Sequence, residues 1–230
     1  MQRKLVLFDI DETLIYSDGT GRRAIGKALM DTFGVKPEAI KVSMSGKTDQ
    51  QILCEIMGAC GYSREQYEER LEELYDLYLS ILKQEILRAD PYKIHDGVYD
   101  LLDELSSRTD ISLGLLTGNI ERGARLKLDK FGLNKYFPIG AYGSDAFDRL
   151  ALPAVARHRG EAYYKTKFEP SQIVIIGDSI YDVLCAQKYG AVSIAVHTGK
   201  TQRRELEALS PDFLFPSLKD VHAVLKAIIN

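Results

Sequence analysis

Asp9 and Asp11 are the first residues in the chain whose types and spacing could do chemistry. They follow the apolar run Leu5–Phe8, which predicts a strand buried on both faces of a parallel sheet. A carboxylate at the end of such a strand is costly unless a cation, a hydrogen-bond donor or a substrate compensates its charge. The carboxyl ends of strands are also where open α/β sheets bind ligands. Because Asp often caps the element that follows, this pair alone does not decide between catalysis and capping.

Two later segments bring further polar groups to the ends of apolar runs. Thr117, Gly118 and Asn119 follow one run and open an expected helix, so they offer a hydroxyl and backbone N–H groups to an anion. Asp178 follows another run, and Asp182 comes at the start of the next expected helix. Taken singly, the first segment could be an ordinary helix start, and Asp182 could be an acid favoured by the helix dipole. Together with Asp9 and Asp11 they indicate one site.

A basic residue completes this set. Arg149 lies in the segment that leaves the carboxyl end of the expected strand ending at Ala141, and it opens the following helix. Lys165 comes after that helix, so it should lie at the opposite end of the sheet. This geometry favours Arg149 as the cation of the site and leaves Lys165 as the alternative. The competing interpretation is that Arg149 forms an ordinary surface ion pair.

The convergence of these side chains predicts phosphoryl transfer. Carboxylates gathered near one point form a site for a hard cation, and Mg²⁺, which prefers oxygen ligands and retains waters, suits it best. A threonine hydroxyl, backbone N–H groups and an arginine complement a phosphate. A carboxylate, a phosphate and Mg²⁺ together suggest transfer through an aspartyl-phosphate.

The elements that must position these residues fall into two blocks. The segment Ser17–Lys93 shows only helical periodicity, with helices expected from Thr20 or Gly21 to Phe33, from Thr48 or Asp49 through Ile56, and over Glu65–Leu87. After His95, helices alternate with apolar strands expected at Ile111–Leu116, Phe137–Ala141, Ile173–Ile176 and Val192–Val196, with a possible edge strand at Phe213–Leu214. Such alternation implies right-handed crossovers and a parallel sheet.

The predicted fold class is therefore α/β, a doubly wound parallel sheet with an inserted all-helical cap domain. The catalytic core is expected to comprise residues 1–16 and 94–230, and the cap residues 17–93. Because the insertion leaves from the carboxyl end of the first strand, the cap should lie over the acidic site.

The composition of the chain argues against several classes of function. The 230 residues carry a net charge of −3, without the basic excess typical of nucleic-acid binders. No apolar run approaches the length of a membrane span, and no signal-peptide core precedes the first strand. Three cysteines without CxxC spacing argue against disulfides and a thiolate metal site. We expect a cytoplasmic protein, monomer or homodimer, whose partner is a small phosphorylated metabolite rather than nucleic acid or membrane.

The motifs resemble those of a haloacid dehalogenase-superfamily phosphatase with a helical cap, similar to the phosphoglycolate phosphatase group. The first motif of that family, DxDxT, matches Asp9, Asp11 and Thr13, and its second, a strand ending in Ser or Thr, matches Thr117. Its fourth motif, GDxxxD, matches Asp178 and Asp182. The combination is specific for the superfamily, implies a Rossmann-like core over nearly the whole chain, and says little about substrate.

The resemblance also implies roles for these residues. Asp9 would be the nucleophile, and Asp11 would protonate the leaving oxygen and then deprotonate the hydrolytic water. Mg²⁺ would be held by the Asp9 carboxylate, the main-chain carbonyl of Asp11 and Asp178, with support from Asp182. Phosphate oxygens would be held by Thr117, by the N–H groups of Gly118 and Asn119, and by Arg149. The cap would exclude water and select the leaving group.

The chain departs from the family pattern at two places. Many relatives have Gly where Glu12 stands, and many have Lys-Pro where this sequence has Asp148-Arg149. The planar fork of an arginine is not equivalent to the point charge of a lysine. In the cap, Lys47 and Arg22 resemble substrate-facing positions, so they are the candidates for contacting an anionic leaving group; otherwise both are solvated surface residues.

Four other functions compete with a phosphatase. A 2-haloacid dehalogenase needs neither Mg²⁺ nor an acid at Asp11, and a phosphonatase would need a cap lysine that forms a Schiff base, for which Lys47 is the candidate. A sugar-phosphate mutase uses the same core and returns the phosphoryl group to a sugar, and no feature of the sequence excludes it. A non-catalytic binding module would have no reason to retain both Asp9 and Asp11.

Overall fold

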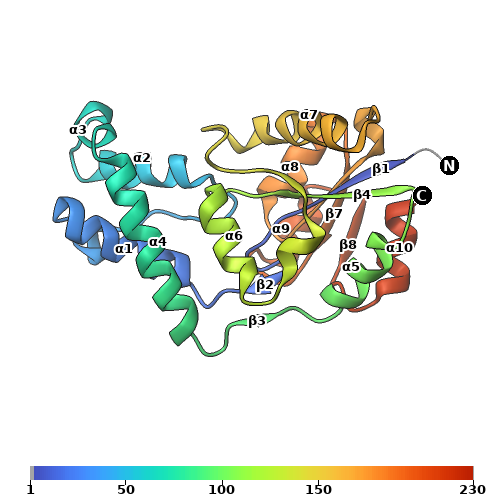
Figure 1. Ribbon diagram of the computed structural model, residues 1–230, viewed down its shortest axis with the longest axis horizontal. Helices are drawn as coiled ribbons and strands as arrows, with labels where there is room; N and C mark the ends of the chain where they lie inside the picture. Colours follow the sequence, from blue (N-terminus) through green and yellow to red (C-terminus); the bar gives the residue numbers. More distant parts are fainter. Residues whose placement is uncertain (1–2, 230) are drawn as a thin grey trace.

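The computed structural model describes residues 3–229 and is built on a six-stranded parallel sheet in the order β5-β4-β1-β6-β7-β8 (Figure 1). The strands are β1 (Lys4–Phe8), β4 (Ile111–Leu116), β5 (Ile139–Ala141), β6 (Ile173–Gly177), β7 (Val192–Val196) and β8 (Phe213–Phe215). The order reverses at β1, which pairs with β4 on one side and β6 on the other. The first strand thus lies at the centre of the sheet, although an insertion separates it from the others in sequence.

Strand β1 is buried on both faces, as its apolar run predicts. Leu5 and Leu7 join one apolar cluster, with residues of α7 and α8, while Val6 and Phe8 join the other, with residues of α5, α6 and α10. Helices therefore cover both faces of the sheet, which confirms the doubly wound architecture. The core helices are α5 (Val98–Ser106), α6 (Glu121–Asp129), α7 (Leu152–Tyr164), α8 (Ile180–Tyr189), α9 (Arg203–Ala208) and α10 (Val221–Ile229).

A helical cap is inserted between β1 and β4 and lies at the left of Figure 1. It contains α1 (Thr20–Phe33), α2 (Asp49–Ala59), α3 (Arg64–Glu68) and α4 (Leu71–Arg88), with a short 3-10 turn at Pro37–Ala39. Helices α1 and α4 pack side by side, burying Ala24, Ala28 and Leu29 against the aromatic and aliphatic face of α4. Further 3-10 turns lie in the core at Leu133–Tyr136, Arg149–Ala151 and Pro170–Gln172.

The structure corrects two expectations about the cap. The single helix expected over Glu65–Leu87 is wrong: the chain turns between α3 and α4, where the side chain of Arg70 donates to the Thr32 carbonyl at 2.6 Å. Two short strands that periodicity did not indicate, β2 (Ile15–Tyr16) and β3 (Lys93–Ile94), form an antiparallel ribbon where the chain enters and leaves the cap. Lys93, expected to end the helical block, lies in this ribbon.

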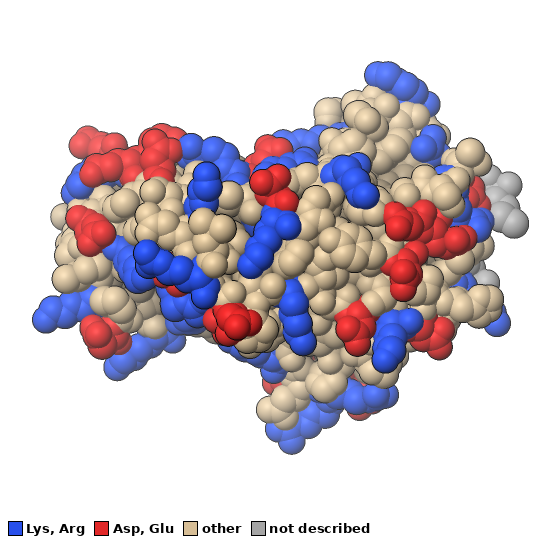
Figure 2. Space-filling model, turned by 60° about the horizontal axis from the view of Figure 1, so that its bottom comes forward, with Lys and Arg blue, Asp and Glu red and all other residues tan. Residues whose placement is uncertain are grey.

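The sheet topology brings the carboxyl ends of β4, β1 and β6 together beneath the cap. Asp9 and Thr117 follow β1 and β4 directly, and Asp178 follows β6. Figure 2 shows positive and negative side chains interspersed on the face drawn, without an extended patch of one sign. Among residues 3–229, no helix combines the length and the apolar character that a membrane crossing requires.

Candidate active site

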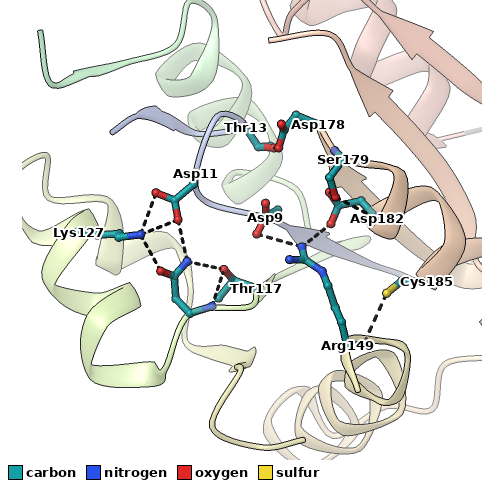
Figure 3. Close-up of polar contacts among 11 residues, drawn as sticks. Asp9, Asp11, Thr13, Thr117, Lys127, Arg149, Asp178, Ser179, Asp182 and Cys185 are labelled. Atoms are coloured by element: carbon teal, nitrogen blue, oxygen red, sulfur yellow. Dashed lines mark hydrogen bonds and ion pairs between the residues drawn. The ribbon is translucent and has the colours of Figure 1, made fainter. Parts of the chain in front are cut away.

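A cavity of about 610 Å³ lies between the ends of the central strands and the cap. The core contributes Asp9, Asp11, Thr117, Arg149 and Asp178 to its wall, so the structure brings these predicted residues together. Figure 3 shows Asp9 in the middle, with Asp11 on one side and Arg149 and Asp182 on the other.

Three buried acids form a cluster beside the end of β1. Carboxylate oxygens of Asp9, Asp178 and Asp182 lie within 4.8 Å of one another. Burial raises the pKa of Asp9 to about 7, and the charges of Asp182 and Asp11 add to this effect while Arg149 opposes it. Burial and the neighbouring acids Asp182 and Asp9 also raise the pKa of Asp178 well above its usual value. Three buried carboxylates beside a single arginine leave negative charge that calls for a further cation.

The Asp178 carboxylate fits a divalent metal ligand. It is 5% exposed and accepts a hydrogen bond from the Thr13 hydroxyl at 3.3 Å, and no lysine or arginine among residues 3–229 pairs with it. A side chain on Gly199 would collide with its Oδ2, so the neighbouring loop approaches the carboxylate closely. Oxygen donors from Asp9 and Asp178 suit a divalent cation, whose charge would lower the pKa values of these acids.

Asp182 is already engaged by the protein. Its Oδ2 accepts hydrogen bonds from the backbone N–H and hydroxyl of Ser179, at 3.0 and 2.6 Å, in a capping box that starts α8. Its Oδ1 contacts the guanidinium of Arg149. Both oxygens have partners, so Asp182 is placed to orient Arg149 and add negative charge near the cluster rather than to offer free lone pairs.

Arg149 is buried at the site, 3% exposed, and is not a surface residue. It starts the 3-10 turn before α7, and its Nη2 lies 3.1 Å from Asp9 Oδ1. Among residues 3–229 its buried Nε has no hydrogen-bond partner, which leaves a donor available to an anion. Lys165, the alternative cation, ends α7 in a left-handed backbone conformation and is exposed, away from the cavity. The structure therefore favours Arg149.

Thr117 and Asn119 are tied to each other and to Asp11. Asn119 Nδ2 donates to Thr117 Oγ1 and to Asp11 Oδ2, both at 2.8 Å. Gly118 has a steric reason to be glycine, because an added Cβ would lie 1.9 Å from the carbonyl oxygen of Lys47 in the cap. This loop both lines the cavity and receives the cap.

Lys127 was missed by the sequence analysis. Its Nζ lies 2.9 and 2.7 Å from the two Asp11 oxygens and 2.7 Å from Asn119 Oδ1, as Figure 3 shows on the left. Burial would raise the pKa of Asp11, but Lys127 and then Asn119 hold it below its usual value. The available signal was a lysine at helical spacing from the small residues Gly123 and Ala124, on the buried face of α6.

The two cap candidates line the cavity, but both make internal contacts. Lys47 pairs with Glu55 of α2, and Arg22 donates to the carbonyl oxygens of Ile40 and Val42 at 3.3 and 2.8 Å. Arg22 thus fastens the loop that follows α1. A contact of either side chain with a leaving group stays a prediction.

The beginning of α2 latches the cap to the core. The Asp49 backbone N–H donates to the Gly118 carbonyl at 2.7 Å, and its Oδ2 accepts from the backbone N–H of Ile120 at 2.8 Å. The Thr48 hydroxyl donates to the Phe147 carbonyl at 2.7 Å. Burial raises the pKa of Asp49 to about 6, with Lys127 opposing the effect.

The cap side of the cavity also offers apolar and phenolic groups. Ile25, Ile52, Leu53, Tyr75 and Tyr78 line it. The hydroxyl of Tyr75 is buried without a hydrogen-bond partner, so it could serve a polar group of a ligand. Neither tyrosine was singled out from the sequence, since both fit an amphipathic helix.

Comparisons with known proteins agree with this geometry. The model of the family "Haloacid dehalogenase-like hydrolase" matches residues 6–196. A phosphoglycolate phosphatase from Neisseria meningitidis is 26% identical over 231 residues, covering 96% of this chain and 93% of that protein. Another from Synechococcus elongatus is 29% identical over 130 residues, where the match spans 56% of this chain and 58% of the relative.

Solved structures share the fold over nearly the whole chain. A protein from Clostridium acetobutylicum, titled a predicted phosphatase, has a TM-score of 0.72 at 19% identity and covers 98% of this chain and 99% of its own. A protein from Thermotoga maritima, provisionally titled a β-phosphoglucomutase, has a TM-score of 0.62 at 18% identity with coverage of 98% and 99%. At these identities the likeness shows the fold alone.

Proposed function

Because the chain belongs to the haloacid dehalogenase-like hydrolases, we propose that it is a Mg²⁺-dependent phosphatase that hydrolyses a small phosphate monoester through an aspartyl-phosphate. The observation that carries the proposal is the position of Asp9. Its carboxylate lies between the buried acid Asp178, which pairs with no lysine or arginine among residues 3–229, and the buried guanidinium of Arg149, whose Nε has no partner among those residues. A nucleophile, a metal site and a phosphate site thus share one point.

In the first step, the Asp9 carboxylate attacks the phosphorus, and the bond from phosphorus to the leaving oxygen breaks. Asp11 gives its proton to that oxygen. Arg149 and the Thr117 hydroxyl bind oxygens of the transferred group, where charge develops in the transition state. Both side chains are held in place before substrate arrives, by Asp182 and by Asn119.

In the second step, a water attacks the phosphorus of the aspartyl-phosphate, and Asp11 takes a proton from that water. The bond between phosphorus and the Asp9 oxygen breaks, which releases phosphate and restores both acids. Asp11 is suited to this exchange because it is 31% exposed, toward the cavity, while its partners Lys127 and Asn119 are buried. The cap latch at Asp49 keeps bulk water out during the first step.

Mg²⁺ would be held by the carboxylates of Asp9 and Asp178 and by the main-chain carbonyl of Asp11. When bound, it would neutralise charge on the phosphate and on the acid cluster. Asp182, whose oxygens are engaged by Arg149 and Ser179, would support the site from outside.

The leaving group would occupy the cap side of the cavity. A volume of about 610 Å³ falls within the range of pockets for small molecules and exceeds what glycolate alone would fill. The apolar wall of Ile25, Ile52 and Leu53 favours a carbon skeleton, and the free hydroxyl of Tyr75 favours a polar substituent on it. A sugar phosphate or another small phosphorylated metabolite fits this description.

A panel assay tests the proposal. Purified protein is incubated with Mg²⁺ and phosphoglycolate, sugar phosphates, nucleoside monophosphates or p-nitrophenyl phosphate, beside an Asp9→Asn variant. We expect Mg²⁺-dependent phosphate release that Asp9→Asn abolishes, because the amide cannot act as the nucleophile.

Two outcomes would change the assignment. Release that continues in Asp9→Asn would contradict the aspartyl-phosphate route. No release from any ester would contradict the phosphatase, and turnover of a sugar phosphate only with a sugar bisphosphate activator would identify a mutase.

A further inference from the structure

Lys127 holds the Asp11 carboxylate at both of its oxygens. The distances from Nζ are 2.9 and 2.7 Å, and a third contact joins Nζ to Asn119 Oδ1 at 2.7 Å. Asn119 in turn donates to Asp11 Oδ2 and Thr117 Oγ1. The carboxylate is therefore fixed by two neighbours that also bond to each other, and this network reaches the proposed phosphate-binding hydroxyl.

The lysine is far less exposed than the carboxylate that it holds, although both border the cavity. The Lys127 side chain is 5% exposed, whereas that of Asp11 is 31% exposed. Gly21 of the cap lies over the amino group, and a Cβ added there would be 3.4 Å from Nζ. The main chain of Lys127 is also anchored, because its carbonyl accepts from the Tyr92 hydroxyl at 3.1 Å. Lys127 therefore borders the cavity beside Asp11, but its amino group is held in place and almost wholly covered.

Packing alone would favour an apolar residue at this position. Lys127 is buried on α6 together with Ala124 and Leu128, which belong to the apolar core. Burying an ammonium group is costly even when it is paired, and apolar replacements of buried ion pairs are often neutral or stabilising. A lysine here needs a reason other than stability.

We propose that Lys127 is a positioning residue that orients Asp11 for both proton transfers, an inference that rests on the proposed phosphatase function. Without it, Asp11 loses the contact that holds both of its oxygens, keeps only weaker neutral partners such as Asn119 and Ser17, and rotates away from the leaving oxygen and the water. The effect should depend on the leaving group, since a nitrophenolate departs without being protonated and an alkoxide does not.

The test is a double-mutant cycle in the full-length protein with Mg²⁺. Wild type, Lys127→Met, Asp11→Asn and the double variant are compared on p-nitrophenyl phosphate and on the best alkyl phosphate from the panel. We expect Lys127→Met to lower kcat about 10²-fold on the alkyl ester and only about tenfold on the aryl ester. In the Asp11→Asn background, Lys127→Met should cause no further loss, because it acts through Asp11.

Lys83→Met is the matched control. It removes the same charge from α4, but Lys83 is exposed and lies outside the cavity. Its kcat should equal that of wild type on both esters. If Lys127→Met unfolds below the assay temperature, Lys127→Gln replaces it in the double-mutant cycle, with the same expectation. Glutamine keeps a hydrogen-bond donor in a similar volume.

Three results would overturn the inference while leaving the phosphatase intact. The first is a kcat equal to that of wild type in Lys127→Met, and the second is an equal loss of kcat on both esters. The third is a loss in the double variant equal to the product of the two single losses, which would indicate that Lys127 contacts the substrate itself. No release by wild type with any ester would instead remove the proposed function and this inference with it.

Discussion

The site contains two buried cations, Arg149 and Lys127, that face two neighbouring acids in different ways. Arg149 contacts Asp9 and Asp182 and retains an unpartnered Nε, so part of its binding capacity is free. Lys127 directs its Nζ contacts at Asp11 and Asn119, inside the protein. One cation is arranged to receive an anion and the other to hold a carboxylate, and this difference separates the phosphate side from the leaving-group side.

Replacing Arg149 by Met should cause the largest loss of stability and of kcat among the variants that test this comparison. It leaves Asp9 and Asp182 buried beside each other without their shared cation, and breaking a buried pair costs about 3–5 kcal/mol. Loss of one donor to the transferred group should also lower kcat about 10²–10³-fold. Urea unfolding and phosphate release measure the two effects.

Two variants give this prediction its controls. Arg149→Lys keeps the charge without the fork, so it should recover most of the stability but less of the activity. Arg159→Met removes an arginine of α7 that pairs with Asp145 and the Gly140 carbonyl away from Asp9, so it should cost stability but leave kcat unchanged. Equal losses in Arg149→Met and Arg159→Met would refute the assignment of Arg149 to the phosphate side.

The phosphate side was readable from the sequence because each of its groups directly follows a strand or opens the next helix. Apolar runs located β1, β4 and β6, and parallel strands end at one edge, so Asp9, Thr117 and Asp178 had to converge. The same alternation gave the doubly wound sheet. What it could not give was the β2–β3 ribbon, because strands of two residues carry no periodicity.

The leaving-group side was hidden for a physical reason. Lys127 lies inside a helix, and Asp49 and Tyr75 lie in the cap, so their neighbours are set by tertiary packing between distant segments. The interruption between α3 and α4 was hidden in the same way, since the contact of Arg70 with the Thr32 carbonyl joins segments that only the folded cap brings together. Local patterns place residues at strand ends, but they do not place one helix face against another loop.

Asp178→Asn tests whether the buried negative charge of the phosphate side destabilises the folded protein. Because the pKa of Asp178 is raised in the folded protein, wild type loses stability as the pH rises above the usual carboxyl value, and an amide avoids that loss. Without metal at pH 7, the variant should therefore be more stable than wild type. The measurement is urea unfolding in chelator.

Adding Mg²⁺ should reverse the order of the two proteins. An ion present at 100 times its dissociation constant stabilises wild type by about 2.7 kcal/mol, and the variant, lacking a ligand, should gain little. Removing the metal with chelator should make the variant the more stable of the two proteins again. A variant less stable than wild type in chelator would mean that the acids are compensated without a metal, against the interpretation of this side.

Asp49→Asn gives the smallest effect and probes the leaving-group side. The pKa of Asp49 is raised to about 6 by burial, so wild type keeps its stability below the usual carboxyl pKa of 3.8 and loses it as the pH rises through about 6. The asparagine oxygen can still accept from the Ile120 N–H, so the latch persists. Because Asp49 also borders the open cavity, we expect a gain of only about 1 kcal/mol at pH 8.

The pH dependence distinguishes this mechanism from a general effect of charge. The stability difference between Asp49→Asn and wild type should be near zero at pH 3.5, should grow between pH 4 and about 6, and should stay constant above it. Asp31→Asn, which changes an exposed carboxylate on α1, should show no such growth. If Asp49→Asn were less stable than wild type at pH 8, the Asp49 charge would stabilise the cap through Lys127. The stability of the leaving-group side would then depend on a charge pair, as that of the phosphate side does.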